Sequence, residues 1–350
     1  MNRVIANKSL LNCGLPFISP DAAENSRAVY IVFIIRTAIN ATTCPLIIFL
    51  NIMVMISVKT KQRLRTKSNI TLACLATTDV LVGLIVQPLQ IARYILMIKG
   101  EAHNSQFCTL VDVVVVVSIR CVLASVFHLF LISAERYIGI HYPLRYSNMV
   151  TETRILLASG VAWIAAIILP TDYLRKTLSK PFLATLAVFI ILFIVIPTIF
   201  YFNISVYIQV RRRKRQIVVT SATTDAKKQL IGYTKAFSTT LILILVMLLS
   251  FIPGYICIAI INTYVDKISA EKRYVIFSIS SLLPVLNSLL NPLIYVVRER
   301  FFRVVFLQLL LRKTISEAKE IERRIFCSSG KIGESAFDRQ PPIVGERGAN

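Results

Sequence analysis

The stretch Cys108–Tyr146 reads CTLVDVVVVVSIRCVLASVFHLFLISAERYIGIHYPLRY, and it decides the class of fold. It begins as an apolar run longer than the roughly 20 residues that a helix needs to cross a bilayer. It ends in a carboxylate, a guanidinium and a phenol side by side, at Glu135, Arg136 and Tyr137. An isolated charge in hydrocarbon is costly, so Arg136 needs water or an anion, and Glu135 can supply part of that partnership. The segment therefore predicts a membrane helix with an ionisable switch at one end.

The composition extends this interpretation to the whole chain. Of the 350 residues, 55% are hydrophobic and only 17% are charged, which is typical of an integral membrane protein and not of a soluble one. The net charge of +22 could indicate a nucleic-acid partner. However, the basic residues lie in the connections and the tail between apolar runs, as the positive-inside rule requires. We therefore expect contact with membrane lipids and no contact with nucleic acid.

Apolar segments recur along the chain and predict an all-α membrane protein, a seven-transmembrane helix bundle with a short amphipathic eighth helix. The seven spans are expected at about 30–57, 69–97, 108–137, 155–173, 181–210, 235–264 and 274–297. The chain then divides into an extracellular tail (1–29), the seven-transmembrane domain (30–298), an amphipathic membrane-surface helix (299–312) and a cytoplasmic tail (313–350). We expect this tail to be disordered because its end is polar and contains Gly and Pro.

The distribution of Lys and Arg predicts the orientation. Most of these residues follow spans one, three and five or lie in the tail, which places the amino terminus outside and the carboxyl terminus in the cytosol. We expect a multi-pass protein of the plasma membrane. The triplet Asn7-Lys8-Ser9 in the outer tail is a glycosylation acceptor pattern, so Asn7 is the candidate glycosylation site.

Short motifs occur in each predicted span, and together they are more specific than any one of them. In chain order they are Asn51; Leu75-Ala76-Thr77-Thr78-Asp79; Glu135-Arg136-Tyr137 with Pro143-Leu144; Trp163; Pro197; Phe251-Ile252-Pro253; and Asn291-Pro292-Leu293-Ile294-Tyr295. In this order the chain resembles the rhodopsin-like (class A) G-protein-coupled receptors over about residues 30–312.

The resemblance implies a receptor, and not an enzyme, that binds an extracellular small-molecule or peptide ligand and activates a heterotrimeric G protein. Arrestin and a receptor kinase are further expected partners. Two other functions stay open: a seven-span transporter or channel, and a ligand scavenger that does not signal. A transporter would favour an internal repeat and Gly-rich broken helices, whereas Gly is scarce in this chain.

The resemblance also implies which residues form the activation switch. These are Glu135, Arg136, Tyr137, Phe251, Pro253, Asn291, Pro292 and Tyr295. Many relatives add a second acidic restraint on the arginine at the start of span six, where this chain has Tyr233. We therefore expect measurable signalling without ligand. The inward-facing tyrosine of span five is expected eight residues after Pro197, where this chain has Ser205, with Tyr207 two residues further on.

Asp79 is a lone carboxylate within span two, and a carboxylate in lipid must be neutralised, paired or bound to a cation. The resemblance implies a sodium pocket formed by Asp79, Ser125, Asn287, Ser288 and Asn291. Oxygen ligands with one carboxylate suit a hard cation such as Na⁺. The alternative is a protonated or water-bonded Asp79 that only joins spans two and seven. We expect Na⁺ as an allosteric ion, no other metal and no required cofactor.

The ligand side is less specific. Amine receptors of this family have an Asp where this chain has Ser118, and no Lys for a retinal Schiff base lies within 274–297. We therefore expect neither a typical biogenic amine nor covalent retinal. By position, the candidate pocket residues are Gln87, Gln90, Tyr94, Ser118, Val122, Tyr255, Asn262 and Ser281, a mixture that suits a small, weakly charged ligand. Arg120 is expected to point toward span four or lipid.

The cysteines do not form a metal-binding pattern. Family members link the top of span three to the loop after span four, but residues 172–181 contain no cysteine. The hypothesis is that Cys13 bonds to Cys108, because both are expected in the oxidising outside compartment.

Overall fold

The computed structural model describes residues 26–101, 105–168, 181–219, 224–264 and 267–327. The chain divides into two units, Met1–Arg298 and Glu299–Asn350, which we describe separately. Every secondary-structure element within the described ranges is a helix, which confirms the predicted all-α class.

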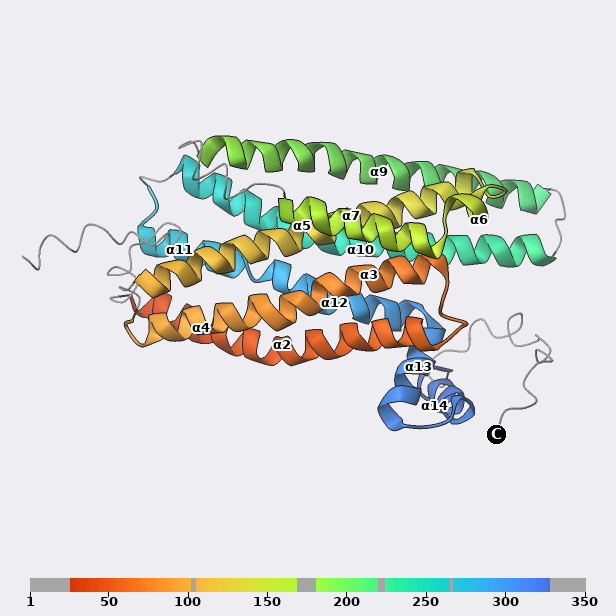
Figure 1. Ribbon diagram of the computed structural model, residues 1–350, viewed down its shortest axis with the longest axis horizontal. Helices are drawn as coiled ribbons and strands as arrows, with labels where there is room; N and C mark the ends of the chain where they lie inside the picture. Colours follow the sequence, from red (N-terminus) through yellow and green to blue (C-terminus); the bar gives the residue numbers. More distant parts are fainter. Residues whose placement is uncertain (1–25, 102–104, 169–180, 220–223, 265–266, 328–350) are drawn as a thin grey trace, which may run out of the picture. The chain divides into compact units, whose positions relative to one another are not determined.

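The first unit is a bundle of long helices that run alongside one another (Figure 1). Its elements are α2 (Arg27–Thr60), α3 (Lys67–Leu81), the π-helical turn η1 (Val82–Val86), α4 (Gln87–Ile98), α5 (Ser105–His141), α6 (Tyr146–Met149), α7 (Glu152–Ile168), α9 (Pro181–Val219), α10 (Thr224–Thr263), α11 (Ala270–Ser280) and α12 (Leu283–Arg298).

Six helical segments of the described residues are long and apolar enough to cross a membrane, with α3–α4 and α11–α12 each counting as one. The fourth span corresponds to α7, which is described over 17 residues. The protein is therefore a multi-pass membrane protein with the predicted seven-helix bundle.

Helix α5 contains most of the stretch Cys108–Tyr146 and packs against neighbouring helices on several of its faces. It contacts α3, α4, α7, α9 and α10. Its inner residues Leu123 and Ala124 are buried against Ala166 of α7. Small residues at such a contact let two helix backbones approach closely, which favours association in lipid.

The outward faces of the bundle are apolar. On α7, Leu157, Val161 and Ile168 are 64%, 65% and 68% exposed. In water such a surface would cause aggregation, whereas in a bilayer it contacts lipid chains. Burial therefore supports the same conclusion as the sequence pattern.

Span two is interrupted by η1 between α3 and α4. Pro88 lies two residues after this turn. Because proline has no N–H to donate to the preceding turn, the helix changes its hydrogen-bond pattern here. Within this turn Gly83 lies close to α2, and its carbonyl accepts a hydrogen bond from the Cys44 thiol of that helix (3.2 Å).

Span seven is also divided, into α11 and α12. The break at Ser281 and Leu282 precedes Pro284, and Pro292 lies inside α12. Since each proline removes one backbone hydrogen bond, the sequence makes this span the easiest of the described ones to bend.

The second unit contains α13 (Arg300–Leu311) and α14 (Ile315–Cys327). Helix α13 corresponds to the predicted amphipathic helix. The buried carboxylate of Glu322 in α14 accepts hydrogen bonds from Arg300 (2.9 Å) and Arg303 (2.9 and 3.0 Å) of α13. These charge-assisted bonds hold the two helices together.

The presence of α14 differs from the expectation of a disordered tail over 313–350. A capping box begins the helix: the Glu317 amide donates to the Thr314 hydroxyl (3.3 Å), and the Thr314 amide donates to the Glu317 carboxylate (3.0 Å). An ion pair between Glu320 and Arg324 follows (3.1 Å). These local signals, together with Glu322, are sufficient reason for a helix over 315–327.

Gly83→Ala is expected to destabilise the bundle. A Cβ at this position would lie 2.7 Å from Cγ1 of Ile48 and 3.4 Å from the Cys44 carbonyl oxygen. Overpacking of this kind costs about 1–3 kcal/mol, so the melting temperature of the purified protein should fall. Gly160→Ala is the control, since a Cβ there meets no atom within 4 Å. Equal melting temperatures for the two variants would contradict the close approach of α2 and η1.

The amino-terminal cap of α14 is expected to weaken in acid. The Thr314 amide, the Thr314 hydroxyl and nearby Lys313 lower the pKa of Glu317 below its usual value. A lowered pKa in the folded state means that the cap is fully stabilising above the ordinary carboxylate pKa and is lost as pH falls through the lowered value. Hydrogen exchange of the Thr314 amide, corrected for its intrinsic rate, should accelerate over that window. In Glu317→Gln this pH dependence should vanish, and a persistent dependence would count against the capping box.

Candidate functional site

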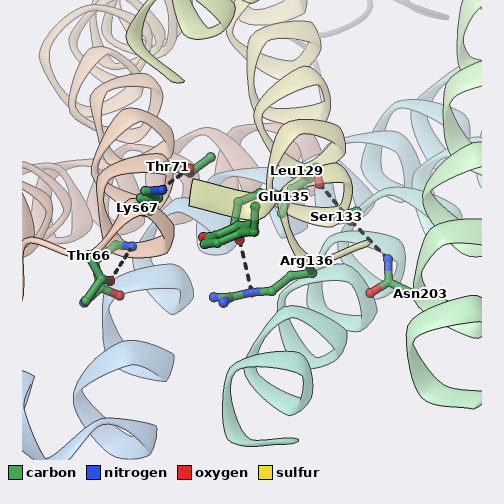
Figure 2. A network of polar contacts seen from close by, with 10 residues as sticks. Thr66, Lys67, Thr71, Leu129, Ser133, Glu135, Arg136 and Asn203 are labelled. Carbon is green, nitrogen blue, oxygen red and sulfur yellow. Dashed lines mark hydrogen bonds and ion pairs between the residues drawn. The ribbon is translucent and has the colours of Figure 1, made fainter. Parts of the chain in front are cut away.

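The switch residues lie at the carboxyl-terminal end of α5. Glu135 is 7% exposed, and its Oε2 lies 3.5 Å from Nε of Arg136, whose side chain is 13% exposed. Figure 2 shows the two side chains facing one another. The other carboxylate oxygen accepts a hydrogen bond from the hydroxyl of Tyr146 in α6. Glu135 is thus held by a cation of its own helix and a phenol of the following loop.

Tyr146 was not among the predicted site residues, and the loop around it is itself held in place. Lys67 of α3 lies over the Tyr146 ring (4.7 Å to the centroid) and donates to the Ser147 carbonyl (3.2 Å). Arg65 forms an ion pair with Glu152 at the start of α7 (2.8 Å). A tyrosine eleven residues after the acid is an ordinary loop residue by sequence, so only the fold shows its role.

Tyr137, the third member of the triplet, faces α9 and not the ion pair. Its ring stacks on His141 (4.2 Å between centroids) and lies near Phe202 (4.9 Å). His141 also contacts the Ser205 hydroxyl (3.1 Å). At the position where the resemblance implies an inward-facing tyrosine, Ser205 therefore contacts His141 of α5.

Tyr207, the alternative tyrosine of span five, is 49% exposed. It packs near Phe237 of α10, with ring centroids 6.3 Å apart. Neither Ser205 nor Tyr207 places a phenol inside the bundle. Asn203 is a buried polar residue of α9, and its amide donates to the Ser133 hydroxyl of α5 (3.0 Å; Figure 2).

The middle of the bundle contains the predicted sodium-pocket residues. The Asn291 amide donates to Oδ2 of Asp79 (2.9 Å), and the Ser288 hydroxyl also interacts with this carboxylate. Ser125 shares a hydrogen bond with Thr78 (3.0 Å), the residue next to Asp79. The structure thus places Asp79, Ser288 and Asn291 together and Ser125 beside them.

Several buried acceptor oxygens in this region have no donor among the described residues. They are Oδ1 of Asp79, Oδ1 of Asn287 and Oδ1 of Asn51. The Asn51 amide meanwhile donates to the Ser288 carbonyl (3.1 Å), which joins α2 to α12. Buried acceptors without donors fit a cation, because a hard cation takes several oxygen ligands at once. A proton on Asp79 would satisfy only one of them.

The remaining switch residues lie on α10 and α12. Tyr295 is 1% exposed, Pro292 is buried, and Phe251 and Pro253 are half-buried. Tyr233, at the position of the missing acidic restraint, lies in α10. The bends that the two prolines introduce are the positions where these helices can change direction.

At the other end of the bundle, three predicted pocket residues contact Arg36, which was not among the predicted pocket residues. Arg36 of α2 is 2% exposed. It donates to the Tyr94 hydroxyl (2.9 Å), the Ser281 hydroxyl (3.1 Å) and, at 3.4 Å, the Gln90 side chain. The Ser278 carbonyl accepts a further bond (2.7 Å). Arg36 therefore joins α2 to both α4 and α11.

A second guanidinium binds the same phenol. Arg93 donates to the Tyr94 hydroxyl (2.7 Å), and its Cζ lies 4.7 Å from the Tyr94 ring centroid, against 5.4 Å for Arg36. Two positive charges that bind the same hydroxyl oxygen repel one another. A neutral phenol and the ring reduce this repulsion but do not cancel the charge.

The other candidate pocket residues do not join this cluster. Gln87 is fully buried and donates to Thr43 of α2 (2.7 Å), whereas Ser118 bonds to the Val114 carbonyl of its own helix (2.6 Å). Val122 is half-buried. The side chains of Tyr255 and Asn262 lie outside the described residues. The eight residues are therefore not one continuous site in the described part of the chain.

Two further polar residues of α5 contact α7. Nε of Arg120 approaches the Ile167 carbonyl (3.4 Å), in agreement with the expectation that it points toward span four. His128, which the sequence analysis did not single out, is fully buried and bonds to the Ala124 carbonyl (2.7 Å) and the Ser159 hydroxyl (2.8 Å). Its role is to link two helices.

Cys108 at the start of α5 is disulfide-bonded, whereas Cys44, Cys74, Cys121 and Cys257 are free thiols. Cys13, the hypothetical partner, lies outside the described residues. The pairing of Cys13 with Cys108 therefore stays a prediction, as does glycosylation of Asn7, which is also outside them.

Comparison with known proteins gives the class of this fold and site. Residues 50–174 match the family described as 7 transmembrane receptor (rhodopsin family). The human histamine H2 receptor is 34% identical over 119 residues, which cover 34% of this chain and 32% of that receptor. The adenosine receptor A3 of Bos taurus is 25% identical over 284 residues, covering 74% of this chain and 84% of that receptor.

A match of similar extent links the chain to the alpha-1A adrenergic receptor of Oryzias latipes, 34% identical over 119 residues. The aligned part thus covers about a third of the length of the histamine H2 receptor and a smaller share of the adrenergic receptor. It covers most of the adenosine receptor. With these matches, the helix bundle and its ordered motifs are similar to those of membrane receptors. Over these residues the chain is similar to the rhodopsin-like, class A G-protein-coupled receptors, and the proteins that it matches are receptors.

Proposed function

We propose that this receptor binds an extracellular ligand and, in response, activates a heterotrimeric G protein from the cytosolic end of the bundle. It would lie in the plasma membrane with its amino terminus outside. The observation that carries the proposal is the restrained pair of Glu135 and Arg136, held from α6 by Tyr146. A charge pair that is nearly buried at a helix end can exist in two arrangements, with Arg136 bound to Glu135 or released to another partner.

The ligand would bias these arrangements only through contacts that differ between them. Helices α10 and α12 contain Pro253 and Pro292, and a proline inside a helix is a place where the helix can bend. Movement of either helix would change the surroundings of Arg136, which then becomes available to a G protein. Arrestin and a receptor kinase are proposed as further partners on family grounds.

The names of the relatives refer to histamine, adenosine and adrenergic receptors, so they do not agree on one ligand. Ser118 hydrogen-bonds to its own helix where amine receptors have an Asp, which supports a ligand other than a typical biogenic amine. The absence of a Lys within 274–297 supports a receptor without covalent retinal.

We also propose that Na⁺ binds at Asp79 and stabilises the inactive arrangement. The support comes from buried acceptor oxygens of Asp79, Asn287 and Asn51 without donors among the described residues. Ser125, Ser288 and Asn291 would complete the oxygen ligands, and the ion would neutralise the carboxylate.

Tyr146→Phe is expected to raise nucleotide exchange without ligand. The change leaves a buried oxygen of Glu135 without its phenol donor, and a hydrogen bond to a charged group is worth about 1.5–3 kcal/mol, so basal exchange should rise about tenfold. The measurement is GDP–GTP exchange on the four G-protein classes with purified receptor in nanodiscs. Arg136→Gln should remove exchange, and Tyr142→Phe is the control because Tyr142 is an exposed tyrosine of the same region.

Two outcomes of this assay would be decisive. Exchange that is unchanged in a correctly folded Arg136→Gln protein would contradict the switch. Failure of the parent protein to act on any of the four classes would remove G-protein activation and favour a ligand scavenger.

Sodium should stabilise the purified receptor against heat. At about ten times the dissociation constant a ligand contributes about 1.4 kcal/mol, which is about 2–4 °C in melting temperature. The comparison is NaCl against N-methyl-D-glucamine chloride at equal ionic strength. Asp79→Asn should abolish the difference, whereas Asp112→Asn, at an exposed carboxylate, should keep it. A sodium effect of equal size in Asp79→Asn would exclude this site.

A further inference from the structure

The cluster of Arg36, Arg93 and Tyr94 lies at the end of the bundle opposite to Arg136. Arg36 is in the first third of α2, and Arg93 is in α4, the second half of span two. The Arg36 partners Ser278 and Ser281 are at the end of α11. Because neighbouring spans alternate in direction, these segments share the end at which α5 begins. With the proposed orientation this end faces the outside.

The cluster carries two positive charges that no carboxylate balances in the described part of the chain. Among the described residues, neither guanidinium forms an ion pair with a carboxylate: the acceptors are the Tyr94 hydroxyl, serine oxygens and the Gln90 amide. A carboxylate does lie at the same end, on Glu271, but it is exposed and accepts a hydrogen bond from Ser26 (2.5 Å). Buried cations in membrane proteins are usually paired, and those that are not mark functional sites.

The hydrogen-bonding capacity of the two arginines is used unequally. Arg36 has a partner at each of its three nitrogens. Nε of Arg93, in contrast, is buried and has no acceptor among the described residues, while one terminal nitrogen binds Tyr94. A guanidinium presents its donors as a flat fork that matches the two oxygens of a carboxylate or phosphate. Arg93 therefore offers donors and charge, and Arg36 adds charge from the opposite helix.

The surroundings of the cluster are aromatic and apolar. The Phe33 ring lies 5.9 Å from the Tyr94 ring and 5.8 Å from the Tyr274 ring, and Phe107 of α5 is buried with them. An inorganic ion would gain little from such neighbours. An organic anion would bury its apolar part beside them and so reduce the dielectric screening of its contact with the guanidiniums.

We propose that Arg36 and Arg93, joined through Tyr94, are the anchor for the negatively charged group of the ligand, a carboxylate or phosphate on an organic molecule. The proposal deepens the proposed function, since it names the chemical class of the outside ligand. It replaces the expectation of a weakly charged ligand. In this arrangement an oxygen of the ligand's anionic group accepts hydrogen bonds from the Arg93 guanidinium. The negative charge of this group neutralises positive charge that the Tyr94 hydroxyl does not neutralise.

Thermal unfolding of the full-length receptor, purified in non-ionic detergent without lipid, tests the anchor directly. The probes are benzoate against benzamide and phenyl phosphate against phenol, all at equal sodium concentration and ionic strength. At least one anion should raise the melting temperature by about 2–4 °C at about ten times its dissociation constant, while its neutral partner should not. The two anionic arms tell a carboxylate ligand from a phosphate ligand.

The variants Arg93→Gln and Arg36→Gln should each lose most of this shift, whereas Arg93→Lys should keep part of it because the charge remains. Arg120→Gln is the matched control, since Arg120 is also on a spanning helix but faces α7. Because Arg36 makes several buried contacts, its variant can fail to fold, and the Arg93 pair then carries the test alone. An equal shift in the parent and Arg93→Gln would overturn the proposal, as would no shift with either anion.

A larger shift with a short-chain phosphatidic acid than with phenyl phosphate would overturn the assignment to a soluble ligand and indicate a lipid headgroup. Binding is measured here without any G protein. Loss of the anion effect is therefore distinguishable from failure of nucleotide exchange, which would count against the proposed function only.

Discussion

A bilayer offers no hydrogen-bond partners, and this constraint determines how the polar residues of the bundle are arranged. Each polar side chain on an inner face must find a donor or acceptor on its own helix or a neighbouring one. Asn51 joins α2 to α12, Gln87 joins α4 to α2, and Asn203 joins α9 to α5. These contacts fix the rotation of the helices about their axes, which apolar packing alone leaves loosely determined.

Three sites at different depths of the bundle differ from one another in the sign of their unbalanced groups. Acceptor oxygens without donors surround Asp79 in the middle, and an excess of positive charge surrounds Tyr94 at one end. At the other end, Glu135 and Arg136 form a pair that a phenol restrains. In the proposed function, each of these sites has a different external partner: a cation, an oxyanion and a protein.

The fold could be predicted from sequence because span length and apolar composition are local properties. The pairing of Glu135 with Arg136 and of Asp79 with Asn291 could be inferred from ordered motifs. The Arg36 cluster could not, because it forms from three helices that are distant in the chain and Arg36 alone is simply a cation in an apolar run. Tyr146 lies in a loop whose path depends on Lys67 and α6. Helix α14 was not predicted because the polar composition of the tail was given more weight than the capping box at Thr314 and Glu317.

The π-helical turn Val82–Val86 separates two halves of one span that serve different ends of the molecule. Asp79 lies before it, and Gln90, Arg93 and Tyr94 lie after it. One residue corresponds to about 100° of helix rotation, so a one-residue insertion or deletion in this turn would re-aim the outer half while the inner half kept its register. Such a change would redirect the residues proposed to bind the ligand while those of the proposed sodium site kept their positions.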